Sequence, residues 1–419
     1  MVTLFTDKKD CCGCGACMNI CPKHAISMQE DEYGFIYPKI DNEKCIGCQL
    51  CKKTCAYQNH KVENEAQKVY VAQATTEIIN KSASGGIFAC LAHRVIEAEG
   101  IVYGVALEYV NGKLVPRHIA ITNDVDLIRI QGSKYVQSNI GTIYTEVKKA
   151  LLSDKIVLFS GTPCQVDGLK SYLGKKYSNL FCIDIICHGV PNSRFFQDYI
   201  AILEKKYSEK IIDFKFRDKV RGWGLTANAY TANAYTANAY TANANNIIIP
   251  CEQSSYYDIF LNSYNYRINC YTCKYANMNR VGDITIGDYW CVENEHPELF
   301  IRNGGKINEK LGVSCVIVNN EHGTDLLKVY GNDLFLYEST YEQAAKHNDQ
   351  LNRPCILNIK LREKVLKAYK EQGYQAVEKI YEHYVMVRKA KQGLKNALKF
   401  VLPRYVIDIL KKLKNKDVE

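Results

Sequence analysis

The chain has 419 residues, of which 47% are apolar, and it carries 19 cysteines and a net charge of +9. From Arg388 onward ten Lys/Arg oppose three Asp/Glu, a net +7, which leaves +2 for the rest of the chain. A globular protein of two or three domains is expected, and the charge is too localised to indicate a body that binds nucleic acid.

The N-terminal segment, MVTLFTDKKDCC, has no apolar stretch of the kind found in signal peptides. No run reaches the roughly 18 apolar residues of a membrane-spanning helix. We therefore expect a cytoplasmic protein whose thiols stay reduced and available to iron.

Two runs of cysteines lie within the first 55 residues, and both have the spacing C-x2-C-x2-C-x3-C. Bacterial two-cluster ferredoxins use this spacing: three cysteines of a run hold one 4Fe-4S cube, and the fourth ligates the other cube. A third cysteine at this distance suits a cube better than zinc, which usually takes separated C-x2-C pairs, or a disulfide. The first cluster is expected on Cys11, Cys14, Cys17 and Cys55, and the second on Cys45, Cys48, Cys51 and Cys21.

Residues 1–60 are predicted to form a small ferredoxin-like βαβ-type domain around these cysteines. Segment 25–40 alternates like a β-hairpin, with a polar turn near Asp31 and Gly34. A polar linker at 58–68 leads to a larger α/β domain and a helical C-terminal tail. The predicted fold class is therefore α+β or mixed α/β.

The first part of the larger domain, residues 69–150, opens with a predicted strand at 69–74 and a Ser/Gly loop. A helix follows, with Ile87, Leu91 and Val95 on one face and Ser84 as candidate N-cap. Free backbone N–H groups at such a helix start suit a phosphate, although an ordinary capped helix explains the same residues. The polar segment 131–138 could lie along a nucleotide or be a solvated loop.

The second part, residues 151–355, contains two buried-type strands, 155–160 and 180–186, joined by a helix. This unit favours parallel strands, which would bring Cys164 and Cys187 together at the carboxyl edge of the sheet. Cys270 and Cys273 form a C-x2-C pair further on. The four thiols could hold a third iron–sulfur cluster or a zinc ion; alternatively, two are core cysteines beside a zinc pair.

Two further segments have unusual composition. Residues 226–244 repeat TANAY and are predicted to form a long low-complexity loop inserted between two strands. The tail, residues 360–419, is predicted to be helical, basic and amphipathic. It could lie on an anionic membrane surface, dock on a partner or pack on its own domain.

Several short motifs together resemble the beta-subunit family of the coenzyme F-420 hydrogenases and dehydrogenases. In chain order they are SASGGIF at 82–88, QGSKYVQS at 131–138, FSGTPCQV at 159–166, CHGVP at 187–191, FRDK at 216–219 with GW at 222–223, CYTC at 270–273 and GDITIGDYW at 282–290. The likeness runs from the ferredoxin motif to about residue 291, continues more weakly to about residue 320, and does not cover the tail.

The resemblance implies a flavoprotein whose FAD is held by the Ser82–Gly86 loop and the Gln131–Ser138 segment. It also supports a third cluster on the four downstream thiols. The resemblance does not identify the substrate, because no residue of this sequence is specific for the deazaflavin coenzyme. The implied FAD-binding residues are Ser82, Ser84, Gly85, Gly86, Gln131, Gly132, Ser133, Lys134 and Tyr135, and the implied third-cluster ligands are Cys164, Cys187, Cys270 and Cys273.

We therefore expect an FAD-dependent iron–sulfur oxidoreductase that moves electrons between a small-molecule substrate and the clusters, with a redox partner protein at the ferredoxin domain. His188 and Asp288 are candidate proton carriers near the flavin, and each could instead be structural. A function of another class, a non-catalytic electron-transfer subunit of a partner enzyme, fits the same motifs. The basic tail suggests a role in cell-surface polysaccharide or lipid-linked synthesis.

Overall fold

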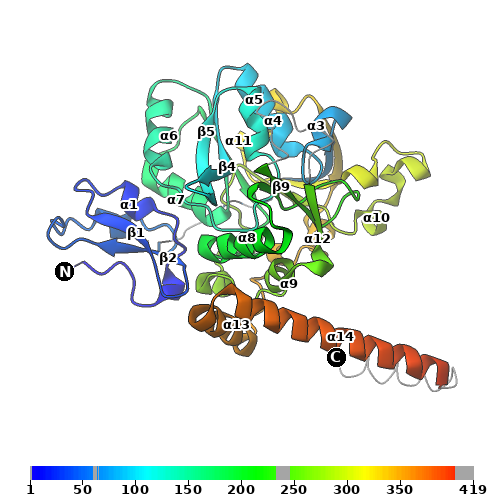
Figure 1. Ribbon diagram of the computed structural model, residues 1–419. Helices are drawn as coiled ribbons and strands as arrows, with labels where there is room; N and C mark the ends of the chain where they lie inside the picture. Colours follow the sequence, from blue (N-terminus) through cyan, green and yellow to red (C-terminus); the bar gives the residue numbers. More distant parts are fainter. Residues whose placement is uncertain (1, 60–63, 65, 233–245, 402–419) are drawn as a thin grey trace.

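The computed structural model describes residues 2–59, 64, 66–232 and 246–401 (Figure 1). The N-terminal unit contains an antiparallel hairpin of β1 (Ile26–Glu30) and β2 (Ile36–Ile40), flanked by α1 (Ala16–Asn19) and α2 (Leu50–Lys53). The hairpin forms where it was predicted. The predicted βαβ order is replaced by helix–strand–strand–helix, because each cysteine run supplies a short helix and both runs lie outside the hairpin.

A mixed sheet of eight described strands forms the centre of the larger domain. Its order is β13–β3–β12–β11–β7–β6–β4–β5, and the four strands from β11 to β4 run parallel. The parallel strands therefore present their carboxyl ends at one edge, as predicted for 155–160 and 180–186. The strands are β3 (Lys68–Ala74), β4 (Ile101–Val110), β5 (Lys113–Ile121), β6 (Val157–Gly161), β7 (Leu180–Ile185), β11 (Ile284–Asp288), β12 (Ser314–Val318) and β13 (Leu334–Ser339).

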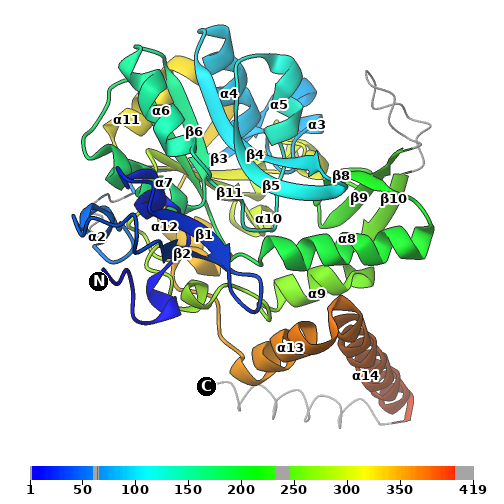
Figure 2. The same cartoon turned by 60° about the vertical axis from the view of Figure 1, so that its left-hand side comes forward.

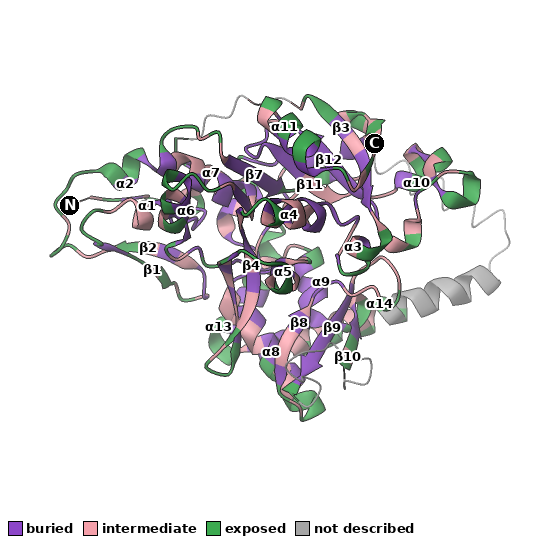
Figure 3. Cartoon of the chain, turned by 90° about the horizontal axis from the view of Figure 1, so that it is seen from above, coloured by how far each residue is buried: buried purple, intermediate pink, exposed green. Residues whose placement is uncertain are grey.

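Helices cover both faces of this sheet, and alternate side chains of each strand pack on opposite faces. In β6, Phe159 packs with the α6 and α7 side chains, whereas Leu158 packs with α4 and α11. The sheet is consequently buried over most of its area (Figure 3). The covering helices are α4 (Ile87–Glu97), α5 (Asp124–Ile130), α6 (Ile143–Leu152), α7 (Pro163–Leu173) and α11 (Glu321–Tyr330).

The start of α4 differs from the prediction. Gly86, not Ser84, is the N-cap residue, and its φ of +84° is a left-handed conformation that glycine adopts without strain. The Ser84 hydroxyl instead donates to the Val313 carbonyl oxygen at 3.1 Å, across to the strand region before β12. The short helix α3 (Thr76–Asn80) precedes this loop. The Ser/Gly loop is thus fixed by contacts distant in sequence.

A smaller antiparallel sheet corrects the prediction for the TANAY repeat. Residues Thr226–Thr231 form β9, the central strand between β8 (Ile211–Lys215) and β10 (Asn246–Pro250), and all six are buried. Ala227 and Ala229 alternate into the core beneath α8 (Ser193–Tyr207) and α9 (Ser255–Leu261). The strand forms because this alternation matches the two-residue period of a sheet. Residues 233–244 of the predicted loop lie outside the described residues.

The C-terminal part is helical, with α13 (Ile359–Gln372) followed by α14 (Tyr374–Val401) below the body (Figure 2). The hydroxyl of Tyr381 donates to the Glu252 carbonyl oxygen at 2.9 Å, which attaches α14 to the region of α9. The later part of the predicted amphipathic tail lies outside the residues whose side chains are described. Within the described ranges, no helix has the length and apolar character needed to cross a membrane. Two further short helices are α10 (Val292–Glu295) and α12 (Tyr341–Ala345).

The N-terminal unit packs on the side of α6 and α7 (Figure 2). The amide of Asn19 donates to the Gly141 carbonyl oxygen at 2.8 Å, and the Ser171 hydroxyl donates to that of Thr54 at the same distance. Lys274 Nζ donates to the Tyr57 carbonyl oxygen at 2.7 Å. These contacts hold the cysteine runs against the edge of the larger domain.

Candidate functional site

The cysteines of the two N-terminal runs gather in the crossed arrangement predicted from their spacing. Around the second group the four thiols line one small cavity, and Cys48 in it is exposed to solvent. In the first group, burial raises the pKa of Cys17 well above its ordinary value, and the neighbouring thiols of Cys14, Cys11 and Cys55 raise it further. The second group is Cys21, Cys45, Cys48 and Cys51, and the first is Cys11, Cys14, Cys17 and Cys55.

The buried and closely spaced thiols are suited to a positively charged iron–sulfur core. Burial raises the pKa of Cys55 to about 11, and the charges of Cys14 and Cys11 act in the same direction. Thiolates packed together in a dry environment repel one another, so their ionisation requires a positively charged centre. All 19 cysteines are free thiols. In the described ranges, no three or more His, Cys, Asp or Glu side chains form a group that could hold a single metal ion.

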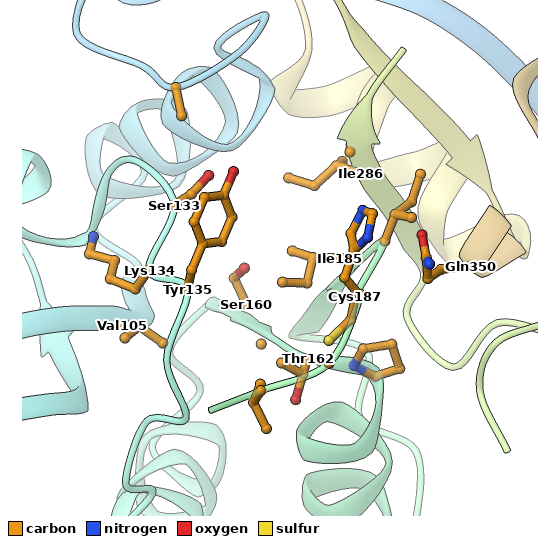
Figure 4. A pocket seen from close by; sticks show the side chains of 18 of the residues that line it. Val105, Ser133, Lys134, Tyr135, Ser160, Thr162, Ile185, Cys187, Ile286 and Gln350 are labelled. Atoms are coloured by element: carbon orange, nitrogen blue, oxygen red, sulfur yellow. The ribbon is translucent and has the colours of Figure 1, made fainter. Parts of the chain in front are cut away.

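A cavity of about 460 Å³ lies at the carboxyl edge of the parallel strands (Figure 4). Its volume is within the range of small-molecule and cofactor sites. The wall contains residues from every motif region noted in the sequence. These are 82–84 and 86–89, 130–138, 160–165, 185–190, Arg217, Cys270 with Cys273, and 286–288 with Trp290.

The four downstream cysteines all line this cavity. Cys164 lies in the first turn of α7, which Thr162 and Gln165 close with a capping box, and Cys187 follows β7. Burial raises the pKa of Cys187 strongly, and the thiols of Cys164 and Cys273 add to the effect. The structure thus brings together side chains that are separated by more than 80 positions in the sequence.

The fourth thiol of this group, Cys270, belongs to the same surroundings. Burial raises its pKa well above the ordinary value, and Cys187, Cys273 and Cys164 raise it further. The pKa of Cys273 is raised to about 11 by burial. Mutual repulsion of buried thiolates therefore applies here as in the N-terminal groups.

Sequence reasoning missed Cys12, which is 4% exposed and also lines the cavity. Its thiol interacts with both Cys14 and Cys164, and these contacts, followed by burial, raise its pKa well above the ordinary value. Cys12 therefore lies between the first N-terminal group and the cavity group. Its position directly after Cys11 is outside the ligand spacing, so no local signal distinguished it.

The predicted FAD-binding residues lie on the cavity wall, with one exception. Gly85 packs behind the wall, where a Cβ would come within 2.6 Å of the Ala72 carbonyl oxygen. Tyr135 stacks on Phe260 with ring centroids 4.7 Å apart, and Figure 4 shows its ring directed towards the middle of the cavity. The other seven on the wall are Ser82, Ser84, Gly86, Gln131, Gly132, Ser133 and Lys134.

Lys134 folds back on its own loop and donates to the Gln131 carbonyl oxygen at 2.6 Å (Figure 4). Burial lowers its pKa to about 7, because the loop screens the ammonium from water. Lys219 of the FRDK motif serves the other loop: its Nζ donates to the carbonyl oxygen of Ser84 at 2.9 Å. Both lysines therefore stabilise loops of the cavity wall.

The two candidate proton carriers have different surroundings. The side chain of His188 opens onto the cavity, and burial by the surrounding wall lowers its pKa. Asp288 forms an ion pair with Arg217 and accepts a hydrogen bond from Trp223 Nε1 at 3.1 Å. Arg217 also lies over Trp290, which stacks on Trp223. Asp288 thus belongs to one network with Arg217, Trp223 and Trp290, which come from different motifs of the sequence.

The fold and the paired cysteine runs together define an iron–sulfur electron-transfer protein. Residues 10–59 match the 4Fe-4S dicluster domain, and residues 154–343 match the C terminus of the coenzyme F-420 hydrogenase/dehydrogenase beta subunit. Residues 154–343 thus belong to the coenzyme F-420 hydrogenase/dehydrogenase beta-subunit family, and a 4Fe-4S dicluster domain precedes them in the chain.

Curated relatives match separate parts of the chain. An uncharacterized ferredoxin of Methanocaldococcus jannaschii is 37% identical over 54 residues, which are 13% of this chain and 69% of that protein. A second uncharacterized protein of the same organism is 27% identical over 198 residues, 40% of this chain and 54% of its own length. The uncharacterized ferredoxin-like protein YdhY of Escherichia coli is 40% identical over 52 residues, 12% of this chain and 24% of its own length. The chain thus spans about half or less of the length of the latter two.

Among solved structures, the F-420-reducing NiFe hydrogenase complex from Methanosarcina barkeri contains a similar chain. It has 15% sequence identity and a TM-score of 0.41, covering 75% of this chain and 92% of that chain.

Proposed function

We propose that this chain is an FAD-dependent oxidoreductase in which the large cavity holds the flavin and the cysteine groups hold three 4Fe-4S clusters. The first cluster would be held by Cys11, Cys14, Cys17 and Cys55, the second by Cys21, Cys45, Cys48 and Cys51, and the third by Cys164, Cys187, Cys270 and Cys273. Flavin supplies exchange of two electrons with an organic substrate and of single electrons with clusters, which side chains cannot supply.

The cavity wall supports the placement of FAD. The first N–H groups of α4 have no acceptor within the helix, and they follow a Ser/Gly loop on the wall. Lys219 holds the carbonyl oxygen of Ser84, which stabilises the loop in this position. Tyr135 offers an aromatic face towards the space where a ring system would lie.

Arg217 and Asp288 would form the floor of the same site. Their ion pair, covered by Trp290, keeps a guanidinium fixed beside the cavity. Since Asp288 already accepts from Arg217 and Trp223, its contacts favour a positioning role over proton transfer. His188 remains the candidate for proton transfer, because its side chain opens onto the cavity.

The Cys12 thiol contacts both Cys164 of the cavity group and Cys14 of the first N-terminal group, and this contact is the main support for the proposal. A flavin in the cavity would then lie next to a third cluster, and that cluster next to the first. Anaerobic purification should give a brown protein with flavin and about twelve irons per chain, as three 4Fe-4S cubes require. Zinc without acid-labile sulfide, or clusters without flavin, would contradict the proposal.

A second candidate function is an electron-transfer subunit that serves a partner enzyme. The surface around the second cysteine group favours it, because Cys48 is exposed beside two large exposed apolar residues, Ile46 at 61% and Leu50 at 39%. Such a patch suits transient docking of a redox partner. Substrate-dependent flavin reduction by the isolated chain would support the first candidate, and flavin reduction only with a partner present would support the second.

A further inference from the structure

Arg267 is a fully buried cation at the junction of the N-terminal unit and the cavity, with 0% of its surface exposed. Its Nε donates to the Cys11 carbonyl oxygen at 3.0 Å, and its Nη1 donates to that of Ile36 at 2.7 Å. Nη2 lies 3.7 Å from Cys11 Sγ in a hydrogen bond to the sulfur. The guanidinium also lies 4.0 Å from the ring centroid of Tyr37.

The backbone of Arg267 reaches the other side of this junction. The amide of Cys270 donates to the Arg267 carbonyl oxygen at 3.0 Å, and the Arg267 amide donates to that of Val190. The residue therefore lies between Cys11 of the first group and Cys270 of the cavity group. Gly13 packs against it so closely that a Cβ there would come within 3.1 Å of the guanidinium carbon.

The positive charge of Arg267 has no carboxylate partner among the residues that the structure describes. Two other buried arginines do: Arg280 pairs with Asp184, and Arg217 pairs with Asp288. A buried cation without a counter-charge is costly. The guanidinium instead donates to the sulfur of Cys11, a candidate cluster ligand.

We infer that Arg267 is the counter-charge of the first cluster and raises its reduction potential through Cys11. Hydrogen bonds to sulfur and the net charge around a cluster are recognised determinants of its potential. Reduction adds one electron, and hence one negative charge, to the cluster and its thiolates. A cation held at Cys11 stabilises this more negative state. Arg267 acts through a ligand, so it is a positioning residue.

The test is a redox titration of the anaerobic protein with dithionite as electron donor, followed by electron paramagnetic resonance. In Arg267→Met, the reduction equilibrium constant of the first cluster should fall about tenfold, which for one electron is about 59 mV towards lower potential. Arg267→Lys retains a charge but loses the planar fork, and should give a smaller shift. The second cluster is the internal reference, and its potential should stay unchanged.

Arg362→Met is the matched control. Arg362 donates to the carbonyl oxygen of Tyr266, the residue before Arg267, at 3.1 Å, but it is partly exposed and donates to no thiol among the described residues. Removing its charge should leave both cluster potentials unchanged. Equal shifts in the two arginine variants would assign the effect to general charge and overturn the inference.

A measurement on the wild-type protein covers the case in which no Arg267 variant retains its cluster. Arginine carrying a heavy nitrogen isotope should produce a hyperfine coupling to the reduced first cluster and none to the second. Absence of that coupling overturns the inference even if all clusters are present. The inference rests on the proposed first cluster alone; lack of the third cluster contradicts the proposed function and leaves the test at Cys11 intact.

Discussion

Cys12 contacts Cys164 across the boundary between the N-terminal unit and the sheet domain, and its thiol also contacts Cys14. A non-ligand thiol therefore fills the space between two candidate cluster sites. We predict that Cys12→Ala retains iron, sulfide and flavin but slows electron transfer from flavin to the N-terminal clusters, because the sulfur that shortens the gap is gone. Stopped-flow reduction monitored at the flavin and cluster bands measures the rate.

The matched control is Cys90→Ala, which removes an equally buried thiol from α4. It should leave the transfer rate unchanged. A normal rate in Cys12→Ala would show that electrons cross elsewhere, and loss of iron would show that Cys12 is itself a ligand.

Two cysteine substitutions should separate the cluster sites. Cys48→Ser is expected to remove the second cluster and leave flavin bound, since Cys48 lies in the N-terminal unit at the solvent face. Cys270→Ser is expected to remove the third cluster and block transfer from flavin, while both N-terminal clusters persist. Iron analysis with paramagnetic resonance spectra checks both. Loss of flavin from Cys48→Ser would contradict the division of roles.

Lys134 should make stability depend on pH. Its folded pKa of about 7 lies below the 10.5 of an ordinary lysine. Between these values the folded state binds fewer protons than the unfolded state, so stability rises as pH increases, by at most about 1.4 kcal/mol per pH unit. Lys134→Met lacks this contribution. The urea midpoints of the wild type and of Lys134→Met should be measured at about pH 7 and at about pH 10. The wild type should gain stability relative to the variant at the higher pH. The same difference between the two proteins at both pH values would refute the pKa assigned to Lys134.

The buried strand in the repeat gives a stability prediction. Ala229→Asp places an unpaired charge in the core beneath α8, which should cost about 3 kcal/mol or more. Ile248→Asp, on the neighbouring strand β10, changes a residue that is 40% exposed and should have little effect. Denaturant midpoints compare the two. Equal tolerance would mean that β9 does not contribute to the core.

The sequence predicted the features that depend on the spacing and order of residues close together in the chain. The cysteine spacing gave the crossed grouping, and strand–helix–strand order placed Cys164 and Cys187 at one edge. Contacts between distant segments were not predictable in this way. Arg267 and Cys12 matter because of neighbours far along the chain, and Ser84 was assigned as a cap although its hydroxyl bonds to Val313. The TANAY composition concealed the alternation of alanines that makes β9 a strand.

Cys48 is exposed, whereas the region of Arg267 is deeply buried. This difference affects how fast oxygen reaches each group of cysteines. Oxygen dissolved in water meets the exposed Cys48 first, whereas Cys12 is 4% exposed and is reached by way of the cavity. Brief aeration would then strip iron from the second group before the inner ones. If the second group holds a cluster as proposed, its loss would end electron exchange with a partner while the cavity stays intact.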